Sequence, residues 1–350
     1  MLKHVRATLL LEALTLVICA VIYPAFLLGV GKLLFPSQAE GSLIDKSGKP
    51  VTNPDEAVGS SLIGQTFADE AHFQTRPSAT SPGYNAAASA ATNWGANNPL
   101  LRDRVARIIG PIAKYADGPQ KGQPVGPDVE KWFQQDLVGG KEKGIVAAWA
   151  KNYPTLATNW VKSDPLITEF VAGWMKEHAD AVAKFKSEHD GAEPQPPDMA
   201  GDFFESFVKT SPGAWPSIQE EKAADGTATK SVKPVTTGSD IQTYFFDMWL
   251  QEHADAKLEK VPADMVMASG SGLDPHITLK NAEYQTDRVA AAWAARTKQD
   301  EGKIKKEIQE LLKQKADSIM GGKIRTWIVN VLEVNLALED KFGSQVVSDK

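Results

Sequence analysis

The feature that most constrains this chain is an apolar run near its N-terminus. Residues 7–31 read ATLLLEALTLVICAVIYPAFLLGVG, in which Glu12 is the only charged side chain. At about 1.5 Å per residue, a helix of this length crosses a bilayer core of roughly 30 Å. We therefore expect residues 7–35 to form one transmembrane helix, preceded by a short tip at residues 1–6.

The charges that flank this run predict its orientation. Lys3 and Arg6 precede it, whereas Lys32 follows it without any basic cluster beyond. The positive-inside rule then predicts a cytoplasmic N-terminus and an extracytoplasmic main domain. A cleaved signal peptide and a lipoprotein anchor are the alternatives. An uncleaved anchor is favoured because the run is long for a signal peptide and because bulky Val17 and Ile18 precede Cys19.

Glu12 is the unusual residue of the expected helix. Ionisable groups within a span are costly and often face a partner or a watery cavity. At helical spacing, Glu12 and Tyr23 fall on one face, together with Leu16 and Cys19. Glu12 either contacts a partner helix or reaches the lipid headgroups, and the sequence leaves both open. Pro24 is expected to kink the helix.

Composition excludes several classes of protein. The 350 residues carry 38 basic and 44 acidic side chains, a net charge of −6, and 42% of them are hydrophobic. These values are typical of a chain that folds, and they argue against a nucleic-acid partner, which requires a basic excess. A single cysteine excludes a disulfide framework and a cysteine zinc site. The length predicts about two domains.

The pattern of the chain beyond the apolar run indicates an α+β domain interrupted by a mainly helical, tryptophan-rich insertion. Short apolar runs broken by Gly, Pro and Asn, including 41–44 and 61–67, predict short strands. The other expected elements are a helix at 99–115, a linker at 118–127, helices within 128–186, a polar loop at 223–240, an amphipathic helix at 300–313 and a packed closing element at 329–338.

An internal echo lies in the helical region. Residues 174–181, WMKEHADA, recur as WLQEHADA at 249–256, which suggests a duplicated helical hairpin. The Trp-x-x-x-His pair of each copy lies on one helix face. A packed face is the favoured interpretation of these pairs, and a metal or quinone-like ligand site is the alternative.

No residue set in the sequence predicts catalysis. The segment DKSG at 45–48 is interpreted as a turn, and GSG at 270–272 lacks the Lys-Ser/Thr pair of a phosphate loop. Neither H-E-x-x-H nor G-x-S-x-G occurs. We expect no catalytic residues and no metal site, and a hydrolase is therefore disfavoured.

Several motifs nevertheless resemble, in order, those of the C subunit of the Kdp-type potassium-transporting P-type ATPase. The matching segments are Tyr23-Pro24, 35–43, 61–67, 73–79, 261–277 (VPADMVMASGSGLDPHI), 288–290 and 329–338. The resemblance covers about residues 1–115 and 259–350. It implies that residues 36–115 and 259–350 form the extracytoplasmic domain of this family and that residues 116–258 are an insertion.

The resemblance also implies a function. Subunits of this kind are accessory, non-catalytic parts of a high-affinity potassium uptake complex in the inner membrane, and they are described as catalytic chaperones that raise the ATP affinity of the catalytic subunit. The implied partners are the P-type catalytic subunit, the potassium-channel-like subunit and membrane lipid, and ATP is implied only by the family. Since the predicted topology separates the main domain from cytoplasmic ATP, we favour a structural or gating role near the outer potassium entrance.

The candidate residues for contact with partners come from the anchor and from the loops. They are Glu12, Tyr23, Pro24, Arg76, Asn85, Asp274 and His276. Each loop residue either contacts a partner or only orders its own turn. The alternative function is a membrane-anchored extracytoplasmic binding or scaffold module that acts through its insertion.

Overall fold

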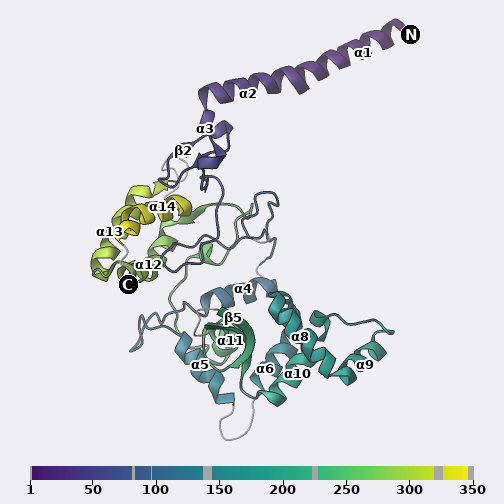
Figure 1. The fold of residues 1–350 in the computed structure, drawn as a ribbon, viewed down its shortest axis with the longest axis vertical. Coiled ribbons are helices and arrows are strands. Elements are labelled where there is room, and N and C mark those ends of the chain that lie inside the picture. The colour runs from purple at the N-terminus through teal and green to yellow at the C-terminus, as the bar shows by residue number, and fades with distance from the viewer. Residues whose placement is uncertain are drawn as a thin grey trace. The chain divides into compact units, whose positions relative to one another are not determined.

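The computed structural model describes residues 2–80, 83–95, 97–136, 144–222, 228–318 and 326–345. The chain divides into two compact units (Figure 1). Unit 1 comprises Met1–Asn93 and Pro262–Lys350, and unit 2 comprises Trp94–Val261. Mixed helix and sheet content agrees with the expected α+β class.

The N-terminal apolar run is a continuous helix made of α1 (Leu2–Val17), a π-helical segment η1 (Ile18–Ile22) and α2 (Tyr23–Leu34). It is the purple helix of Figure 1. Within the described residues, Lys3–Leu34 is the one segment long and apolar enough to cross a membrane. The backbone N–H of Tyr23 donates to the carbonyl of Ile18, so the helix widens by one residue directly before Pro24, which has no N–H to donate.

A small antiparallel sheet follows the short helix α3 (Pro36–Ala39). Its strand order is β2-β1-β3, with β1 at Leu43–Ile44, β2 at Pro50–Val51 and β3 at Gly59–Ser60, and the 3-10 turn η2 (Pro54–Glu56) precedes β3. The expected turn at 45–48 joins β1 to β2, and the Asp45 carboxylate accepts from the backbone N–H groups of Ser47 and Lys49. The pKa of the Asp45 carboxyl is lower than its usual value. The main cause is the hydrogen bond from the backbone N–H of Lys49, and the next is the hydrogen bond from the Ser47 hydroxyl. The strand expected at 61–67 was wrong, because this stretch forms turns and loop instead.

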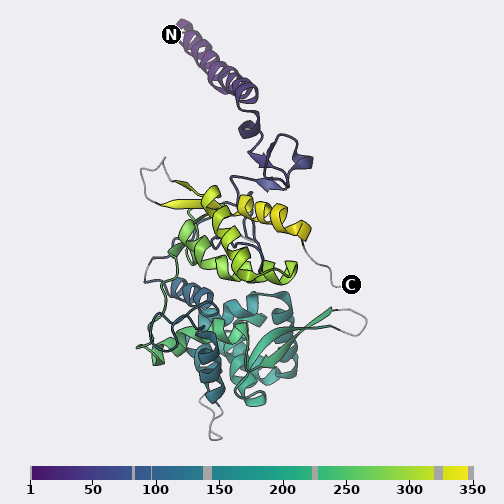
Figure 2. The same ribbon diagram turned by 90° about the vertical axis from the view of Figure 1, so that its left-hand side faces the viewer.

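The second part of unit 1 packs three helices on another antiparallel sheet, drawn in green and yellow in Figure 2. The strands, in the order β6-β8-β7, are β6 (His276–Thr278), β8 (Trp327–Asn330) and β7 (Asp317–Ser318). The helices are α12 (Leu279–Thr297), α13 (Glu301–Lys315) and α14 (Val331–Phe342), with 3-10 turns at η5 (Ala263–Met265) and η6 (Gly343–Gln345). The core between them contains Phe73, Ile277, Val289, Trp293, Ile304, Ile308, Leu312, Val334, Leu338 and Phe342.

The expected helix at 300–313 is confirmed as α13, with Ile304, Ile308 and Leu312 buried. The closing element expected at 329–338 comprises the end of β8 and the start of α14. Its polar residue Asn335 forms hydrogen bonds with the backbone of another segment. The Asn335 side chain accepts from the backbone N–H of Phe73 at 2.8 Å and donates to the carbonyl of the same residue at 2.9 Å. Gln285 on α12 pairs in the same way with the backbone of Gln74. An extended segment is thus held by side-chain amides where a neighbouring strand would otherwise pair with it.

Unit 2 is mainly helical and has its own core. Its elements are α4 (Pro99–Ile109), α5 (Gly126–Gln134), α6 (Ile145–Asn152), α7 (Pro154–Lys162), α8 (Pro165–Glu177), α9 (Ala179–Glu188), η4 (Pro196–Met199), α10 (Ala200–Thr210), β4 (Trp215–Lys222), β5 (Ala228–Val235) and α11 (Ser239–Glu252). Helix α11 packs against α4 and α5. The core is rich in aromatic side chains, including Trp132, Phe133, Trp149, Trp160, Phe203, Phe204, Trp215, Phe245 and Trp249.

Two expected boundaries in unit 2 were wrong. The helix expected at 99–115 ends at Ile109, before Gly110-Pro111. The polar loop expected at 223–240 contains β5, which pairs with β4 over eight residues from Trp215↔Val235 to Lys222↔Ala228. Ion pairs of Lys230 with Glu220 and of Lys233 with Glu221 link the two strands. Because these cross-strand pairs are charged, the sequence of the hairpin is polar and was interpreted as a loop.

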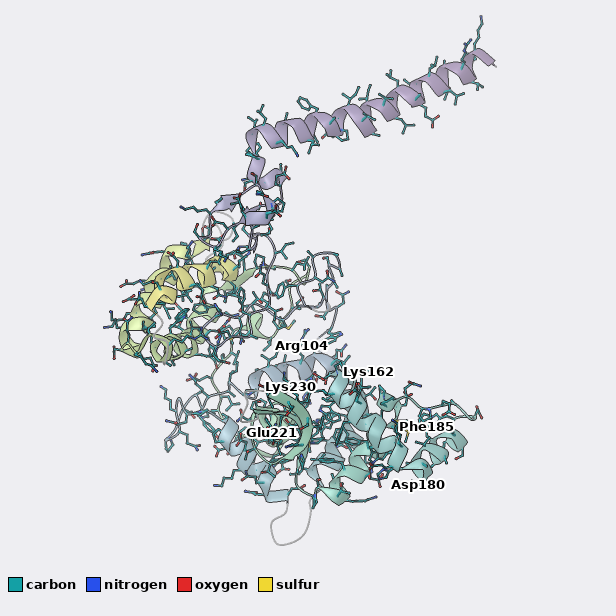
Figure 3. The ribbon with its side chains drawn as sticks, viewed as in Figure 1. Arg104, Lys162, Asp180, Phe185, Glu221 and Lys230 are labelled. Carbon is teal, nitrogen blue, oxygen red and sulfur yellow. The ribbon has the colours of Figure 1, made fainter. Side chains whose placement is uncertain are left out.

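The Trp-x-x-x-His echo is a helix-ending motif and not a duplicated hairpin. His178 follows α8 and His253 follows α11, and the Nδ1 atom of each contacts the carbonyl oxygen four residues earlier, at 2.9 and 2.8 Å. Each imidazole stacks on the tryptophan of the same turn. Phe185, which Figure 3 labels on α9, and His189 repeat the arrangement at the end of that helix. The elements that follow the two copies differ, since α9 follows α8 but no helix follows α11 within unit 2.

Candidate functional site

Two loops of unit 1 meet although about 190 residues separate them in sequence. We call them the loop pair and define it as residues 61–80 with 83–90, together with 264–276. The backbone N–H of Gly64 donates to the carbonyl of Leu273 at 2.8 Å, and that of Ala90 donates to the carbonyl of Ser271 at 3.0 Å. The loop pair therefore forms one hydrogen-bonded body.

Arg76 is the main link between the two loops. Its Nε and Nη2 atoms each donate at 3.2 Å, to the carbonyls of Met267 and Ala268 respectively. Its Nη1 atom lies 3.6 Å from Oδ2 of Asp274. One guanidinium thus donates to two carbonyls of the opposite loop and forms an ion pair with its carboxylate, a combination that suits the planar fork of arginine better than the ammonium group of lysine.

Asp274 is held by His276 as well as by Arg76. The Oδ1 atom of Asp274 accepts from the backbone N–H of His276 at 3.0 Å and lies 3.0 Å from its Nδ1 atom. Burial alone would raise the pKa of the Asp274 carboxyl. The hydrogen bonds from the His276 ring and backbone, with the charges of His276 and Arg76, outweigh burial and lower that pKa.

Ser78 and Tyr84 complete the loop pair. The Ser78 hydroxyl donates to the carbonyl of Gly272 at 2.7 Å and accepts from the backbone N–H of Tyr84 at 3.0 Å. The Tyr84 hydroxyl donates to the carbonyl of Arg76 at 2.7 Å, and burial raises its pKa above the usual value of 10.0. A Cβ atom on Gly64 would lie only 2.3 Å from the Tyr84 ring, so glycine is needed where the ring packs.

The structure brings together three of the seven candidate residues: Arg76, Asp274 and His276. Asn85 lies in the same loop, where its side chain accepts from the backbone N–H of Ala87 at 3.1 Å, as in an Asx turn. Glu12, Tyr23 and Pro24 lie on the exposed anchor helix, apart from this cluster in sequence.

Sequence reasoning missed the roles of Tyr84 and Asp264. Asp264 accepts from the backbone N–H of Thr278 at 2.7 Å and from the Asn281 amide at 3.0 Å, and so fixes the entry into β6 and α12. The one available signal for Tyr84 was a large aromatic residue next to Gly83 and Asn85 in a turn-forming stretch. Tyr84 itself has a left-handed backbone, with φ of 50°.

A depression of about 540 Å³ lies beside Arg76, lined by Thr66, Phe67, Gln74, Thr75, Arg76, Pro77, Ser78, Thr80, Gly83 and Tyr84. This lining contains no carboxylate, imidazole or thiol that could act as a general base. Among the described residues, no group of three or more His, Cys, Asp or Glu side chains is placed to hold a metal ion. The loop pair thus presents a polar surface that its own hydrogen bonds hold in place.

We predict that Asp274→Asn will destabilise unit 1 by about 1 kcal/mol near neutral pH, because it removes a charged acceptor from the loop pair. A carboxyl whose pKa is lowered by folding stabilises the fold above its unfolded pKa, and this contribution disappears as pH falls through the folded pKa. The difference between wild type and variant should therefore shrink below about pH 4. Denaturant unfolding at pH 7 and pH 3.5 measures it, and a difference that is equal at both values would contradict the assignment.

By its length and composition, the N-terminal helix is consistent with a single-pass membrane anchor, and the loop pair belongs to the same unit. Comparison with known proteins specifies the class further. The family model described as K+-transporting ATPase, c chain (KdpC) matches residues 5–130 and 225–340. The chain belongs to this family, and the resemblance found in its motifs is confirmed.

Three relatives named potassium-transporting ATPase KdpC subunit illustrate the similarity. The chain is 45% identical over 121 residues to the protein of Janthinobacterium sp. (strain Marseille), covering 34% of this chain and 60% of the relative. It is 44% identical over 165 residues to that of Polaromonas naphthalenivorans (strain CJ2), covering 46% and 76%. It is 46% identical over 125 residues to that of Herminiimonas arsenicoxydans, covering 35% and 61%. The chain thus spans about 60% of the length of the first of these relatives.

Proposed function

We propose that this chain is the accessory KdpC-type member of a high-affinity, ATP-driven potassium uptake complex. Its partners would be a P-type catalytic subunit and a potassium-channel-like subunit of the same pump, with lipid around the anchor. The observation that carries the proposal is the family match, which includes the anchor and both halves of the loop pair. In this proposal the chain is non-catalytic and stabilises assembly.

We infer that the anchor at residues 7–35 is an uncleaved single pass of the inner membrane, with residues 1–6 in the cytoplasm and the main domain in the periplasm. Lys3 and Arg6 before the helix support this orientation. Glu12, Tyr23 and Pro24 are then the residues offered to partner helices. Protease protection in spheroplasts tests the orientation, because only a periplasmic domain would be digested from outside.

This topology bears on whether the main domain can contact ATP. The catalytic-chaperone role, in which the accessory protein raises the ATP affinity of the catalytic subunit, is implied by the family resemblance. With a periplasmic main domain, any effect on ATP affinity has to travel through the membrane subunits. A structural or gating role near the outer potassium entrance is the form of the proposal that fits the topology best.

We also propose that the chain contains a KdpC-like domain at 36–115 and 259–350 with an insertion at 116–258. Supporting this, residues Trp94–Val261 form a compact unit with its own aromatic core. The stretch 131–224, which lies between the two matched segments, contains α6 to α10.

Deleting residues 119–257, which lie within the proposed insertion, separates the two candidate functions. As an accessory pump component, the shortened chain should restore growth, at least in part, to a strain that lacks the native KdpC protein at limiting potassium. As a membrane-anchored binding or scaffold module acting through its insertion, which is the alternative, it should restore none. The matched control is Arg76→Ala in the full chain, which keeps unit 2 and removes the main link of the loop pair.

A further inference from the structure

A pocket of about 440 Å³ lies in unit 2 and is lined by residues of α8, α10 and β5. Gly173 of α8 is part of the lining, and nothing lies within 4 Å of a Cβ atom built there. Helices α8 and α10 fall within residues 131–224, between the two segments that the family model matches. The apolar residues of the lining include Phe170, Trp174, Phe203, Phe207 and Val232.

Two polar side chains of the lining, Ser206 on α10 and His178 directly after α8, form a hydrogen bond. The Oγ atom of Ser206 and the Nε2 atom of His178 are 3.2 Å apart. The Nδ1 atom of His178 lies 2.9 Å from the backbone carbonyl oxygen of Trp174. Because a carbonyl oxygen only accepts, Nδ1 carries the proton, and in the neutral ring Nε2 then keeps a free lone pair. The Ser206 hydroxyl therefore donates to Nε2.

Trp174 positions both members of this pair. Its indole Nε1–H donates to the Oγ atom of Ser206 at 3.1 Å, and the serine proton is left for His178 because an indole nitrogen cannot accept it. The indole also stacks on the imidazole, with 4.6 Å between the ring centroids. The face of an indole attracts cations and would stabilise the imidazolium form. A hydroxyl, a neutral base and a group that orients the base are the signature of an activated nucleophile.

Two other histidines show that the helix ending itself does not require the serine. His189 and His253 end α9 and α11 with the same Nδ1 contact and the same ring stacking. Among the described residues, His178 is the one of the three whose Nε2 atom bonds a hydroxyl, and it is the one that lines this pocket. The contact with Ser206 is thus additional to the helix-ending role.

We propose that Ser206 and His178 are a nucleophile and a general base that hydrolyse small uncharged carboxylic esters bound in this pocket. The Oγ atom of Ser206 attacks the carbonyl carbon, its proton passes to Nε2 of His178, and the carbonyl oxygen becomes an oxyanion. As this intermediate collapses, the C–O bond to the alcohol breaks and the alcohol leaves with the proton from Nε2.

Water completes the reaction. It attacks the acyl-serine carbonyl and gives one proton to Nε2 of His178. The second collapse breaks the bond between the acyl carbon and Oγ of Ser206, which takes the proton back from Nε2. One ester and one water thus yield one carboxylic acid and one alcohol, and both side chains return to their initial states.

The lining sets the class of ester. Phe203 and Phe207 offer apolar contact to an acyl chain, and the charged side chains of the lining are the carboxylates Glu169 and Glu177. These carboxylates repel anionic esters, so uncharged ones are favoured. Once the serine oxygen is bonded to carbon, the Nε1–H group of Trp174 is available to the neighbouring oxyanion.

Diisopropyl fluorophosphate tests the nucleophile directly, because it bonds covalently to activated serine hydroxyls. The purified full chain in detergent is treated with the probe, and peptide mass spectrometry locates the label. We expect the label on Ser206, and we expect complete labelling to abolish the hydrolysis of p-nitrophenyl butyrate. An unlabelled Ser206, or hydrolysis that continues after Ser206 is fully labelled, would overturn the proposal.

His178→Gln tests the base. Without the imidazole, labelling of Ser206 should be at least about a hundredfold slower. His253→Gln is the matched control, since it removes the same helix-ending contacts from α11 and should label at the wild-type rate. If His178→Gln labelled as fast as wild type, or if both variants were slowed alike, the imidazole of His178 would not be the base.

Gly173→Met tests the pocket. Methionine favours a helix more than glycine does, so α8 should keep its fold while the side chain fills the space beside Gly173 and abolishes ester hydrolysis. Gly201→Met is the matched control, because Gly201 is an exposed residue of α10 that does not line the pocket. Undiminished hydrolysis in Gly173→Met would place the reaction elsewhere and overturn this assignment, and that outcome does not bear on the pump assignment.

Discussion

Gly272→Ala is expected to open the loop pair and to destabilise it by about 3 kcal/mol. Gly272 has φ of 70°, and a Cβ atom there would lie 2.5 Å from the backbone carbonyl oxygen of Ala90. Alanine is thus strained by its backbone conformation and also collides with a group that cannot move independently of the fold. The carbonyl of Gly272 accepts from Ser78, so the shift disturbs the adjoining turn as well.

Hydrogen exchange measures this effect directly. The amides of Gly64 and Ala90 donate across the loop pair, and their protection should fall about a hundredfold in Gly272→Ala. Gly270→Ala is the matched control, because nothing lies within 4 Å of a Cβ atom built there and its φ is not positive. If both variants exchanged alike, the close approach at Gly272 would not be what holds the loops together.

Trp215→Ala is expected to unfold unit 2, with a loss of about 4 kcal/mol. Trp215 is fully buried, and its ring lies 5.0 Å from that of Trp149, 5.2 Å from that of Phe204 and 4.7 Å from that of Tyr244 between centroids. Removing it leaves a large cavity at the centre of the aromatic core. Unit 1 has a separate core and should keep its own thermal transition.

The matched variant Trp215→Phe should cost far less. It retains an aromatic ring and removes an Nε1–H group that is buried without a hydrogen-bond partner among the described residues. Trp327→Ala serves as the second control, since that side chain is 51% exposed in unit 1. Calorimetric scans of the full chain distinguish the two units, and loss of the unit 1 transition in Trp215→Ala would contradict their independence.

A helix could be predicted correctly where its own sequence shows the pattern that defines it. The N-terminal helix is a long apolar run, and α13 has apolar residues at helical spacing, of which Ile304, Ile308 and Leu312 are buried. Strand β5 was not predicted, because Lys230 and Lys233 form ion pairs with acidic residues on the other strand of the hairpin, β4. A single strand with lysines at the surface looks like a polar loop.

The loop pair could be predicted only in part, for a different reason. Arg76 and Asp274 were candidates, but their contact joins loops separated by about 190 residues. Family motifs identified these residues without placing them together. Tyr84 acts through its contacts with Arg76 and Gly64, and no local pattern around it indicates either contact.

Affinity purification of the tagged full chain from membranes tests the central claim most directly. As the accessory component of a potassium pump, the chain should carry with it the P-type catalytic subunit and the channel-like subunit in fixed proportion. The Gly272→Ala variant should recover less of both, while Gly270→Ala should recover as much as wild type. A wild-type chain that is purified intact from the membrane without either of these partners would contradict the account.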